Sequence, residues 1–130
     1  MKFLLDSNAV IALLKGKTVF LTHMLRYRPS DFAVPAIVAH ELFYGAYKGQ
    51  RVSENLARVN ALQFQVLEFD REDAQRAGEL RALLSAAGTP IGPYDILIAG
   101  QAWARGLTLI THNMREFQRV PHIQLEDWEV

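Results

Sequence analysis

The stretch Phe3-Leu4-Leu5-Asp6-Ser7-Asn8-Ala9-Val10-Ile11 decides the fold, because a short apolar run ends in a carboxylate and a helical pattern begins at once. Continuous apolarity over Phe3–Leu5 is typical of a strand that is buried on both faces of a parallel sheet. In such sheets ligands bind beyond the carboxyl ends of the strands, which is where Asp6 lies. The alternative role for Asp6 and Ser7 is to cap the following helix, and this stretch alone does not choose between the two.

The composition predicts one globular domain spanning residues 1–130. Half of the 130 residues are apolar and 22% are charged, which excludes a disordered chain. There is no cysteine, which excludes disulfides, thiolate metal sites and thiol nucleophiles. The apolar runs are too short for a membrane span and the first residues lack a signal-peptide pattern, so we expect a cytoplasmic protein.

The net charge is zero, which argues against a general nucleic-acid coat. The two halves of the chain differ, however. Up to Arg58 there are eight Lys and Arg against four Asp and Glu, and the remainder has six against ten. A cationic face beside an acidic pocket is one interpretation of this asymmetry, and ordinary solvated surface is the other.

Apolar runs and helical periodicities alternate along the whole chain. Strands are expected at residues 3–5, 32–34, 65–69, 107–110 and 123–125. Helices are expected after residue 8 to about 15, and at 19–28, 36–47, 53–62, 71–87, 94–104 and 115–117. This order predicts an α/β domain with a mostly parallel central sheet of about five strands, helices on both faces and right-handed crossovers.

Three carboxylates lie at positions that suit a shared site. Asp6 follows the first strand, Glu41 lies near the inward stripe of the helix after the second strand, and Asp95 shares a face with apolar residues of a later helix. Asn113 and Glu116 follow the fourth strand. Since the carboxyl ends of parallel strands meet at one edge of the sheet, we expect these side chains to converge.

Several carboxylates placed close together repel one another unless a divalent cation neutralises them. With oxygen ligands, no Cys and no paired His, the expected ion is Mg²⁺, with Mn²⁺ as the alternative. His40, next to Glu41, has no partner at ligand spacing and is interpreted as structural. Such a cation acidifies a bound water and stabilises charge on a phosphoryl group.

The same residues lie in four ordered motifs that resemble those of the PIN-domain ribonucleases, specifically the VapC-type toxins of bacterial toxin–antitoxin pairs. The resemblance covers nearly the whole chain. Its motifs are Leu5-Asp6-Ser7-Asn8, His40-Glu-Leu-Phe-Tyr-Gly-Ala46, Pro90-Ile-Gly-Pro-Tyr-Asp95-Ile-Leu-Ile-Ala99 and Thr111-His-Asn113-Met-Arg-Glu116-Phe117, followed by Val120-Pro121 and Glu126-Asp127-Trp128.

The resemblance implies a Mg²⁺-dependent endoribonuclease that hydrolyses structured RNA, with tRNA among the candidates, by means of a metal-activated water. It also implies a homodimer and a VapB-type antitoxin whose C-terminal segment occupies the active-site groove. By motif position Asp6, Glu41 and Asp95 form the acidic core, with Asp6 and Asp95 the foremost metal ligands. Glu41 is then expected to orient or deprotonate the water.

The sequence departs from the broader family pattern at two positions. Ser7 stands where Thr is commoner, and Asn113 stands where many members carry a fourth acid, which puts a second metal ion in doubt. Glu116 either supplies the missing carboxylate or is a solvated residue. Ser7 and Asn113 are expected to support the site. Taking the motifs together, metal ligation is favoured for Asp6, and the helix cap passes to Ser7.

Six basic residues are candidates for contact with the RNA backbone: Lys15, Lys17, Arg26, Arg28, Lys48 and Arg51. The main alternatives are a Mg²⁺-binding receiver-like signalling domain and a catalytically inactive interaction domain. A receiver would need an acceptor Asp after its middle strand, for which only Asp70 is placed. A haloacid-type phosphatase would need a second Asp where this chain has Asn8.

Overall fold

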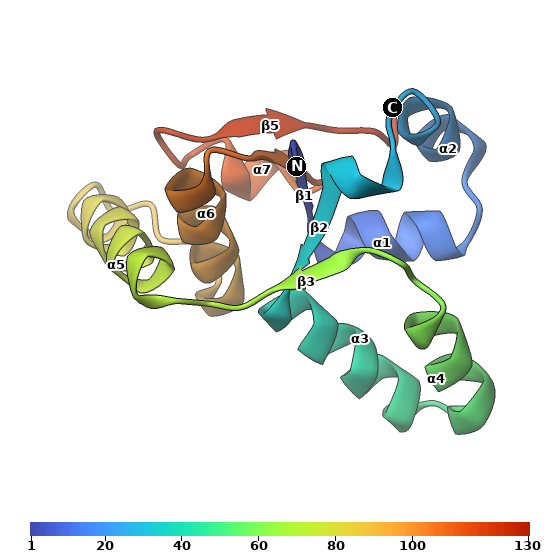
Figure 1. Cartoon of the computed structure of the whole chain (residues 1–130). Helices are drawn as coiled ribbons and strands as arrows, with labels where there is room; N and C mark the ends of the chain where they lie inside the picture. The colour runs from blue at the N-terminus through green and yellow to red at the C-terminus, as the bar shows by residue number, and fades with distance from the viewer.

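Five short strands form one sheet in which every neighbouring pair is parallel, in the order β3-β2-β1-β4-β5 (Figure 1). The computed structural model describes all 130 residues. The strands are β1 (Phe3–Leu5), β2 (Phe32–Pro35), β3 (Gln65–Leu67), β4 (Thr108–Ile110) and β5 (Gln124–Glu126). The predicted α/β fold with five strands is confirmed, and the sheet is parallel throughout.

The helices are α1 (Ser7–Leu14), α2 (Thr18–Met24), the 3₁₀ turn η1 (Pro29–Asp31), α3 (Ala36–Lys48), α4 (Val52–Asn60), α5 (Arg71–Ala86), α6 (Pro93–Arg105) and α7 (Met114–Phe117). None is long and apolar enough to cross a membrane. The prediction that α2 reaches Arg28 is wrong. The helix ends at Met24, and the ring of Tyr27 beyond it packs edge-on against Phe3 at 4.6 Å.

The ends of β3 and α5 also differ from the prediction. Strand β3 ends at Leu67, since the carbonyl of Glu68 accepts hydrogen bonds from the side chains of Gln101 and Arg105 instead of a neighbouring strand. Helix α5 ends at Ala86, and the expected inward residue Ala87 is its exposed C-cap.

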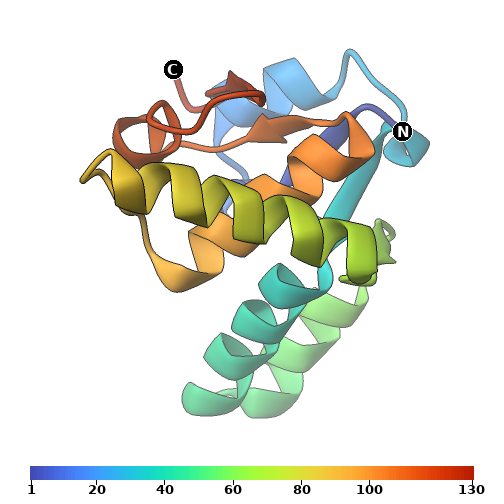
Figure 2. The same ribbon diagram turned by 90° about the vertical axis from the view of Figure 1, so that its left-hand side faces the viewer.

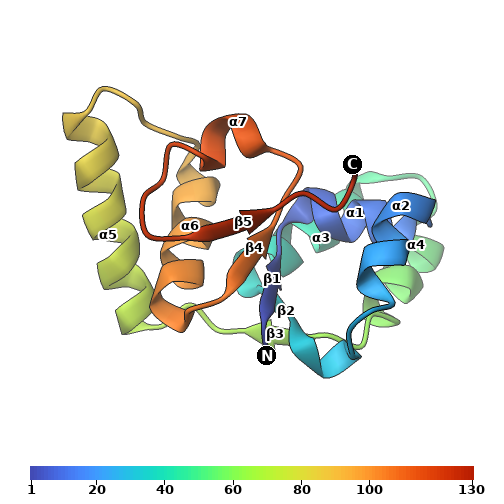
Figure 3. The ribbon, with the colours of Figure 1, turned by 90° about the horizontal axis from the view of Figure 1, so that it is seen from above.

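The direction in which successive strands are added to the sheet reverses between β1 and β4. It runs outward from β1 through β2 to β3, returns to β4, and continues to β5 on the other side. Right-handed crossovers then place α1 to α4 on one face and α5 to α7 on the other, as seen from above in Figure 3. The carboxyl ends of β1 and β4 therefore flank a topological switch point, which is where ligands bind in folds of this kind.

Helices α3 and α4 pack against each other as a hairpin that protrudes from the body of the molecule (Figure 2). Helix α3 begins directly at the carboxyl end of β2, so its first turns lie beside the switch point and its last residues lie far from it. Any side chain on the first half of α3 is thereby brought to the same edge of the sheet as the ends of β1 and β4.

The C-terminal segment closes the core through Trp128, which is 2% exposed. Its indole ring lies 5.0 Å from the ring of Phe3, 5.8 Å from Phe20 and 5.7 Å from Tyr27, measured between ring centroids. Beyond it, Glu129 accepts a hydrogen bond from Lys17 at 2.7 Å. The tail is thus held against β1 and α2, close to the carboxyl edge of the sheet.

Helices α5 and α6 pack at close range. A Cβ added at Gly100 of α6 would lie 2.5 Å from the Cα of Ala77 on α5, so only glycine fits. At the end of this contact the fully buried Asp73 accepts hydrogen bonds from Gln101 at 3.0 Å and from Arg105 at 3.1 Å. These contacts fix the axis of α6, whose first turn carries Asp95.

Candidate functional site

Asp6 lies at the end of β1 and has two roles at once. Its side chain is 4% exposed, and its Oδ1 accepts a 2.9 Å hydrogen bond from the N–H of Ala9, which makes it the N-cap of α1. The prediction that Ser7 is the cap is therefore wrong. A carboxylate accepts the N–H groups of a first helical turn as well as a hydroxyl does, so the cap role and the site role are compatible in one residue.

The environment of Asp6 disfavours its ionised form. Burial is the main cause and raises its pKa to about 6, with smaller contributions from repulsion by Glu129 and Glu41. Hydrogen bonds from the hydroxyl of Thr111 and the N–H of Ala9 oppose this increase. Thr111 is itself 1% exposed and also accepts the N–H of Asn113 at 3.0 Å, so β4 supports the carboxylate at the end of β1.

Ser7 connects α1 to α3. Its hydroxyl donates a 2.8 Å hydrogen bond to Oε1 of Glu41, across 34 residues of sequence. Glu41 is half-buried on the second turn of α3, as the helical periodicity predicted. The predicted supporting role of Ser7 thus has a definite geometry, because its hydroxyl restrains the Glu41 carboxylate at the edge of the sheet.

Asp95 and Glu116 form a carboxyl pair between the first turn of α6 and the short helix α7. Burial, the hydrogen bond with Glu116 and repulsion by Glu116 raise the pKa of Asp95 to about 7. The hydrogen bond from Asp95 lowers the pKa of Glu116, and Asn113 Nδ2 adds a second bond to its Oε2 at 3.3 Å. Glu116 is therefore paired with Asp95 and is not a freely solvated residue, and Asn113 holds it in place.

The predicted residues are brought together at the switch point. Asp6 and Glu41 both contribute by repulsion to the raised pKa of Asp95, so carboxylates from β1, α3, α6 and α7 face a common region. Because ionising them together is unfavourable, a divalent cation with a preference for oxygen ligands fits this set. Asp6, Glu41 and Asp95 surround the site without converging to the spacing of three ligands on one ion.

The tightest group of metal-ligating atoms lies alongside and was not predicted. It comprises His112, Asp127 and Glu129, whose ligand atoms all lie within 4.8 Å of one another. Nδ1 of His112 is already hydrogen-bonded to Asp127 at 2.9 Å, and Glu129 is paired with Lys17. The contribution of this group to the main site is electrostatic, since Glu129 adds to the negative charge facing Asp6.

Thr111 and Glu129 are the site residues that sequence reasoning missed. Thr111 stands directly after β4 in one of the four motifs, and its place next to the end of β1 follows once the strand order is known. Glu129 lies near the end of the chain, and no local pattern connects it with residue 6. The burial of Trp128 and the ion pair with Lys17 bring it there.

The six basic candidates do not form one surface. Arg26 and Arg28 precede β2 and lie at the amino edge of the sheet, opposite the carboxylates, and their contact with the RNA backbone stays a prediction. Lys17 is engaged by Glu129. Lys48 and Arg51 lie at the far end of the α3–α4 hairpin, and Lys15 is exposed after α1.

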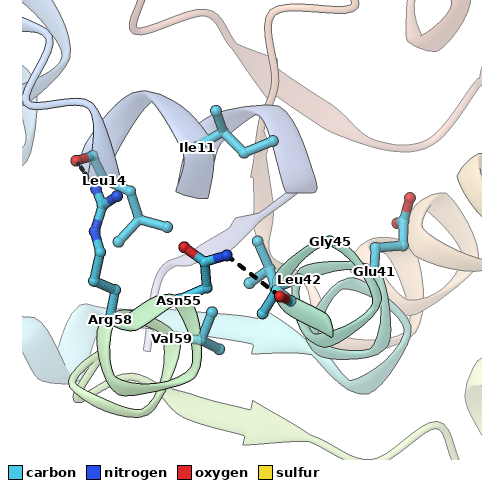
Figure 4. Close-up of a pocket in the computed structure, with 9 residues that line it drawn as sticks. Ile11, Leu14, Glu41, Leu42, Gly45, Asn55, Arg58 and Val59 are labelled. Atoms are coloured by element: carbon cyan, nitrogen blue, oxygen red, sulfur yellow. Dashed lines mark hydrogen bonds between the residues drawn. The ribbon is translucent and has the colours of Figure 1, made fainter. Parts of the chain in front are cut away.

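An apolar hollow of about 250 Å³ adjoins Glu41 between α1, α3 and α4 (Figure 4). Asn55 and Arg58 close its α4 side through hydrogen bonds to the carbonyls of Ala46 at 3.3 Å and Leu14 at 2.8 Å. In Figure 4 the carboxylate of Glu41 points away from the hollow. The apolar part of its lining is Ile11, Leu14, Leu42, Ala46 and Val59.

The receiver-like alternative does not fit this architecture. Strand β3 lies at one edge of the sheet, whereas the phosphoacceptor of such a domain should follow a middle strand. The only candidate, Asp70, is the N-cap of α5 and accepts the N–H of Asp73 at 3.0 Å. Its carboxylate is committed to a helix terminus, away from Asp6 and Asp95.

Comparisons with known proteins agree on the family. The sequence matches the PIN domain over residues 3–123. It is 41% identical over 130 residues to a tRNA(fMet)-specific endonuclease VapC of Salmonella typhimurium and 32% identical to Ribonuclease VapC2 of Haemophilus influenzae, each match covering 98% of both chains. The crystal structure of DNA-bound VapBC from Salmonella typhimurium is similar with a TM-score of 0.92, at 41% identity and 98% coverage of each chain.

Proposed function

The chain belongs to the PIN-domain family, and from this membership we propose that it is a metal-dependent endoribonuclease of the VapC type, neutralised by a VapB-type antitoxin. Relatives that cover nearly the whole chain are named as a tRNA-specific endonuclease and as ribonucleases. We therefore propose structured RNA as the substrate class, with tRNA as the first candidate.

One observation carries the chemistry. Carboxylates from four separate segments surround the switch point of the sheet, and two of them have pKa values raised to about 6 and about 7. Such an arrangement is costly for folding, because burial and mutual repulsion of carboxylates destabilise the native state. A set of this kind is characteristic of a functional site.

Asp6 and Asp95 are the side chains we assign to Mg²⁺, with Glu41 as the third acidic member and Mn²⁺ as an alternative ion. The cation, when bound, offsets the repulsion between the carboxylates, stabilises charge on the phosphoryl group and acidifies water to give the nucleophile. Ser7 holds Glu41 so that its carboxylate is oriented to accept a proton from the attacking water. Asn113 orients Glu116, which in turn positions Asp95.

The antitoxin is the partner for which the apolar hollow beside Glu41 is suited. Solved relatives are VapBC complexes, and the hollow offers apolar side chains next to the carboxylates. We propose that a C-terminal antitoxin segment occupies this groove and blocks access to the site. A homodimer is proposed from the family resemblance alone.

The function is tested by incubating the purified chain with a panel of structured RNAs, with Mg²⁺ and then with excess EDTA. Cleavage only with the ion, abolished in an Asp95→Asn variant that retains its circular dichroism spectrum, is the expected result. The products should carry 5′-phosphate and 3′-hydroxyl ends. A 2′,3′-cyclic phosphate would overturn the hydrolytic mechanism, and undiminished cleavage in EDTA would overturn the metal dependence.

A further inference from the structure

Two exposed aromatic side chains stand directly beside the candidate catalytic acids. His40 precedes Glu41 on α3, and Tyr94 precedes Asp95 on α6. The two rings meet, with centroids 5.8 Å apart and planes at 82° to each other. Two helices that are distant in sequence therefore each contribute one acid and one aromatic ring to the same edge of the sheet.

The exposure of these rings is not required by the fold. Tyr94 keeps 47% of its surface exposed, and His40 is likewise exposed. Tyr94 also borders a shallow hollow of about 350 Å³ between α5 and α6, whose lining includes Phe69, Pro93 and Arg81. Leaving much of a tyrosine ring in water forgoes the stabilisation that its burial would bring.

We propose that Tyr94, braced by His40, is a stacking surface for an unpaired RNA base next to the phosphodiester that is cut. The inference rests on the proposed function and deepens it, because it names how the substrate is held. Every nucleobase has a flat face that stacks on an exposed aromatic ring, and this contact requires an unpaired base.

The charge distribution explains why a stacking contact is needed here. The carboxylates of Asp6, Glu41 and Glu116 repel an RNA phosphate. No lysine or arginine is hydrogen-bonded to these acids, although the charge of Arg119 acts on Glu116 while its guanidinium donates to the carbonyl of Pro90 at 3.1 Å. Of the six basic candidates, Lys17 is engaged by Glu129, and Lys48 and Arg51 lie at the far end of the α3–α4 hairpin. Arg81 lines the hollow that Tyr94 borders, on the side of α5. A base that stacks through its uncharged face adds affinity beside the acids, and this contact needs no lysine or arginine.

The geometry also favours one substrate feature. A base can reach Tyr94 only if it is rotated out of a helix, so the nucleotide next to the cut must lie in a loop, a bulge or a single strand. Because stacking is tolerant of sequence, Tyr94 selects for an unpaired nucleotide and not for a particular base.

The test uses the full-length protein and a short single-stranded RNA that contains 2-aminopurine next to the cleavage site, with EDTA present to keep the RNA intact. Stacking on Tyr94 should quench the 2-aminopurine fluorescence. In Tyr94→Leu the quenching should be lost and the Kd should rise about 5- to 150-fold, whereas Tyr94→Phe should behave like the unmodified protein. His40→Leu should give a smaller loss of quenching.

Tyr47 provides a matched control, since it is 64% exposed and lies on α3 two turns beyond His40. Tyr47→Leu should leave quenching and Kd unchanged. Equal losses in Tyr47→Leu and Tyr94→Leu, or unchanged binding in Tyr94→Leu, would overturn the proposal. If Tyr94→Leu changes only the oligomeric state in size-exclusion chromatography, the ring is a protein contact and the proposal is likewise wrong. Absence of cleavage with any ion would refute the proposed function instead, because quenching is measured without turnover.

Discussion

The hydroxyl of Ser7 donates a 2.8 Å hydrogen bond to Glu41 and so joins the first residue of α1 to the second turn of α3. This bond crosses the edge of the sheet where the carboxylates converge. It restrains Glu41 without neutralising it, because a hydroxyl donor leaves the charge in place. The orientation of Glu41 therefore depends on the hydroxyl of residue 7.

Replacing Ser7 with alanine should slow cleavage with little change in substrate binding. A hydrogen bond to a charged group is worth about 1–2 kcal/mol here, since the pair is only partly buried, and kcat should fall roughly 5- to 30-fold. Single-turnover cleavage measures this. Ser7→Thr keeps the hydroxyl and should retain most of the rate, and a wild-type rate in Ser7→Ala would show that the bond has no catalytic role.

Replacing Asp6 with asparagine should abolish cleavage and stabilise the fold at alkaline pH. The raised pKa means that the folded protein loses stability as pH rises from about 4 to about 6, where unfolded Asp6 ionises more readily. Asparagine keeps the cap and has no such penalty. In EDTA its free energy of unfolding should exceed that of wild type at pH 8, by up to about 3 kcal/mol, and match it at pH 4. Urea unfolding at the two pH values measures this, and a less stable variant at pH 8 would contradict the prediction.

Mg²⁺ should raise the Tm of the protein in a concentration-dependent manner, because a ligand that binds only the folded chain stabilises it by mass action. At 100 times the Kd the gain is about 2.7 kcal/mol. Differential scanning fluorimetry with and without EDTA measures the shift. In Asp95→Asn the shift should shrink markedly, and an equal shift in both proteins would place the ion elsewhere.

Breaking the Asp73–Arg105 pair should destabilise the protein strongly at neutral pH. Asp73 is fully buried and accepts from Arg105 and Gln101, so Asp73→Asn should cost roughly 2–4 kcal/mol. Burial alone would raise the pKa of Asp73, but the hydrogen bonds that it accepts, foremost from Arg105, outweigh burial and lower it. The stabilisation is therefore full above about pH 4, where unfolded Asp73 is also ionised, and is lost as the pH falls below that value.

Urea unfolding at pH 7 and pH 3 should therefore show a large difference between wild type and Asp73→Asn at the higher pH and a smaller one at the lower. The exposed pair of Arg76 and Glu79, 3.2 Å apart, is the control. Glu79→Gln should change stability by less than about 1 kcal/mol, and it leaves the guanidinium of Arg76 in place over the ring of Trp103. A comparable loss of unfolding free energy in both variants would mean that the buried pair contributes no more to stability than the exposed pair.

Two glycines on the paired helices should respond to alanine in opposite directions. In Gly100→Ala the new methyl would lie 2.5 Å from Ala77, so α5 and α6 must separate and stability should fall by about 1–3 kcal/mol. A Cβ at Gly78 on α5 would meet no atom within 4 Å, so Gly78→Ala should stabilise by about 0.5–1 kcal/mol through helix propensity. Thermal unfolding of the two variants tests both signs.

Local patterns in the sequence predict the sheet and most of the site. The apolar runs at Phe3–Leu5 and Phe32–Pro35 form buried parallel strands, since burial on both faces leaves an unbroken apolar signature. Helical spacing correctly places Asp95 on the face of Ile98 and Ala99, which are buried. The order of the motifs then brings the acids to one edge.

Features that depend on contacts between distant segments could not be predicted. The motifs assign Asp6 to metal ligation and so leave Ser7 as the expected cap, but the partner that engages the Ser7 hydroxyl lies 34 residues away. In the sequence Asp73 is typical of an acid in the first turn of a helix, where the helix dipole favours it. It also lies four residues before Ala77 and so on the buried face of α5. The ion pair that makes its burial tolerable comes from α6 and has no sequence signal.

The double role of Asp6 has a consequence for genetics. In a selection for variants that no longer harm the host cell, Glu41 and Asp95 can change to many residues and still leave a folded, detectable protein. At Asp6 most replacements also remove the cap of α1. The variants selected at this position should therefore fall into two groups, those that keep a capping side chain such as asparagine and remain folded, and those that unfold and are removed by proteolysis. Immunoblotting of survivors would separate the two groups and show which part of the phenotype reflects chemistry.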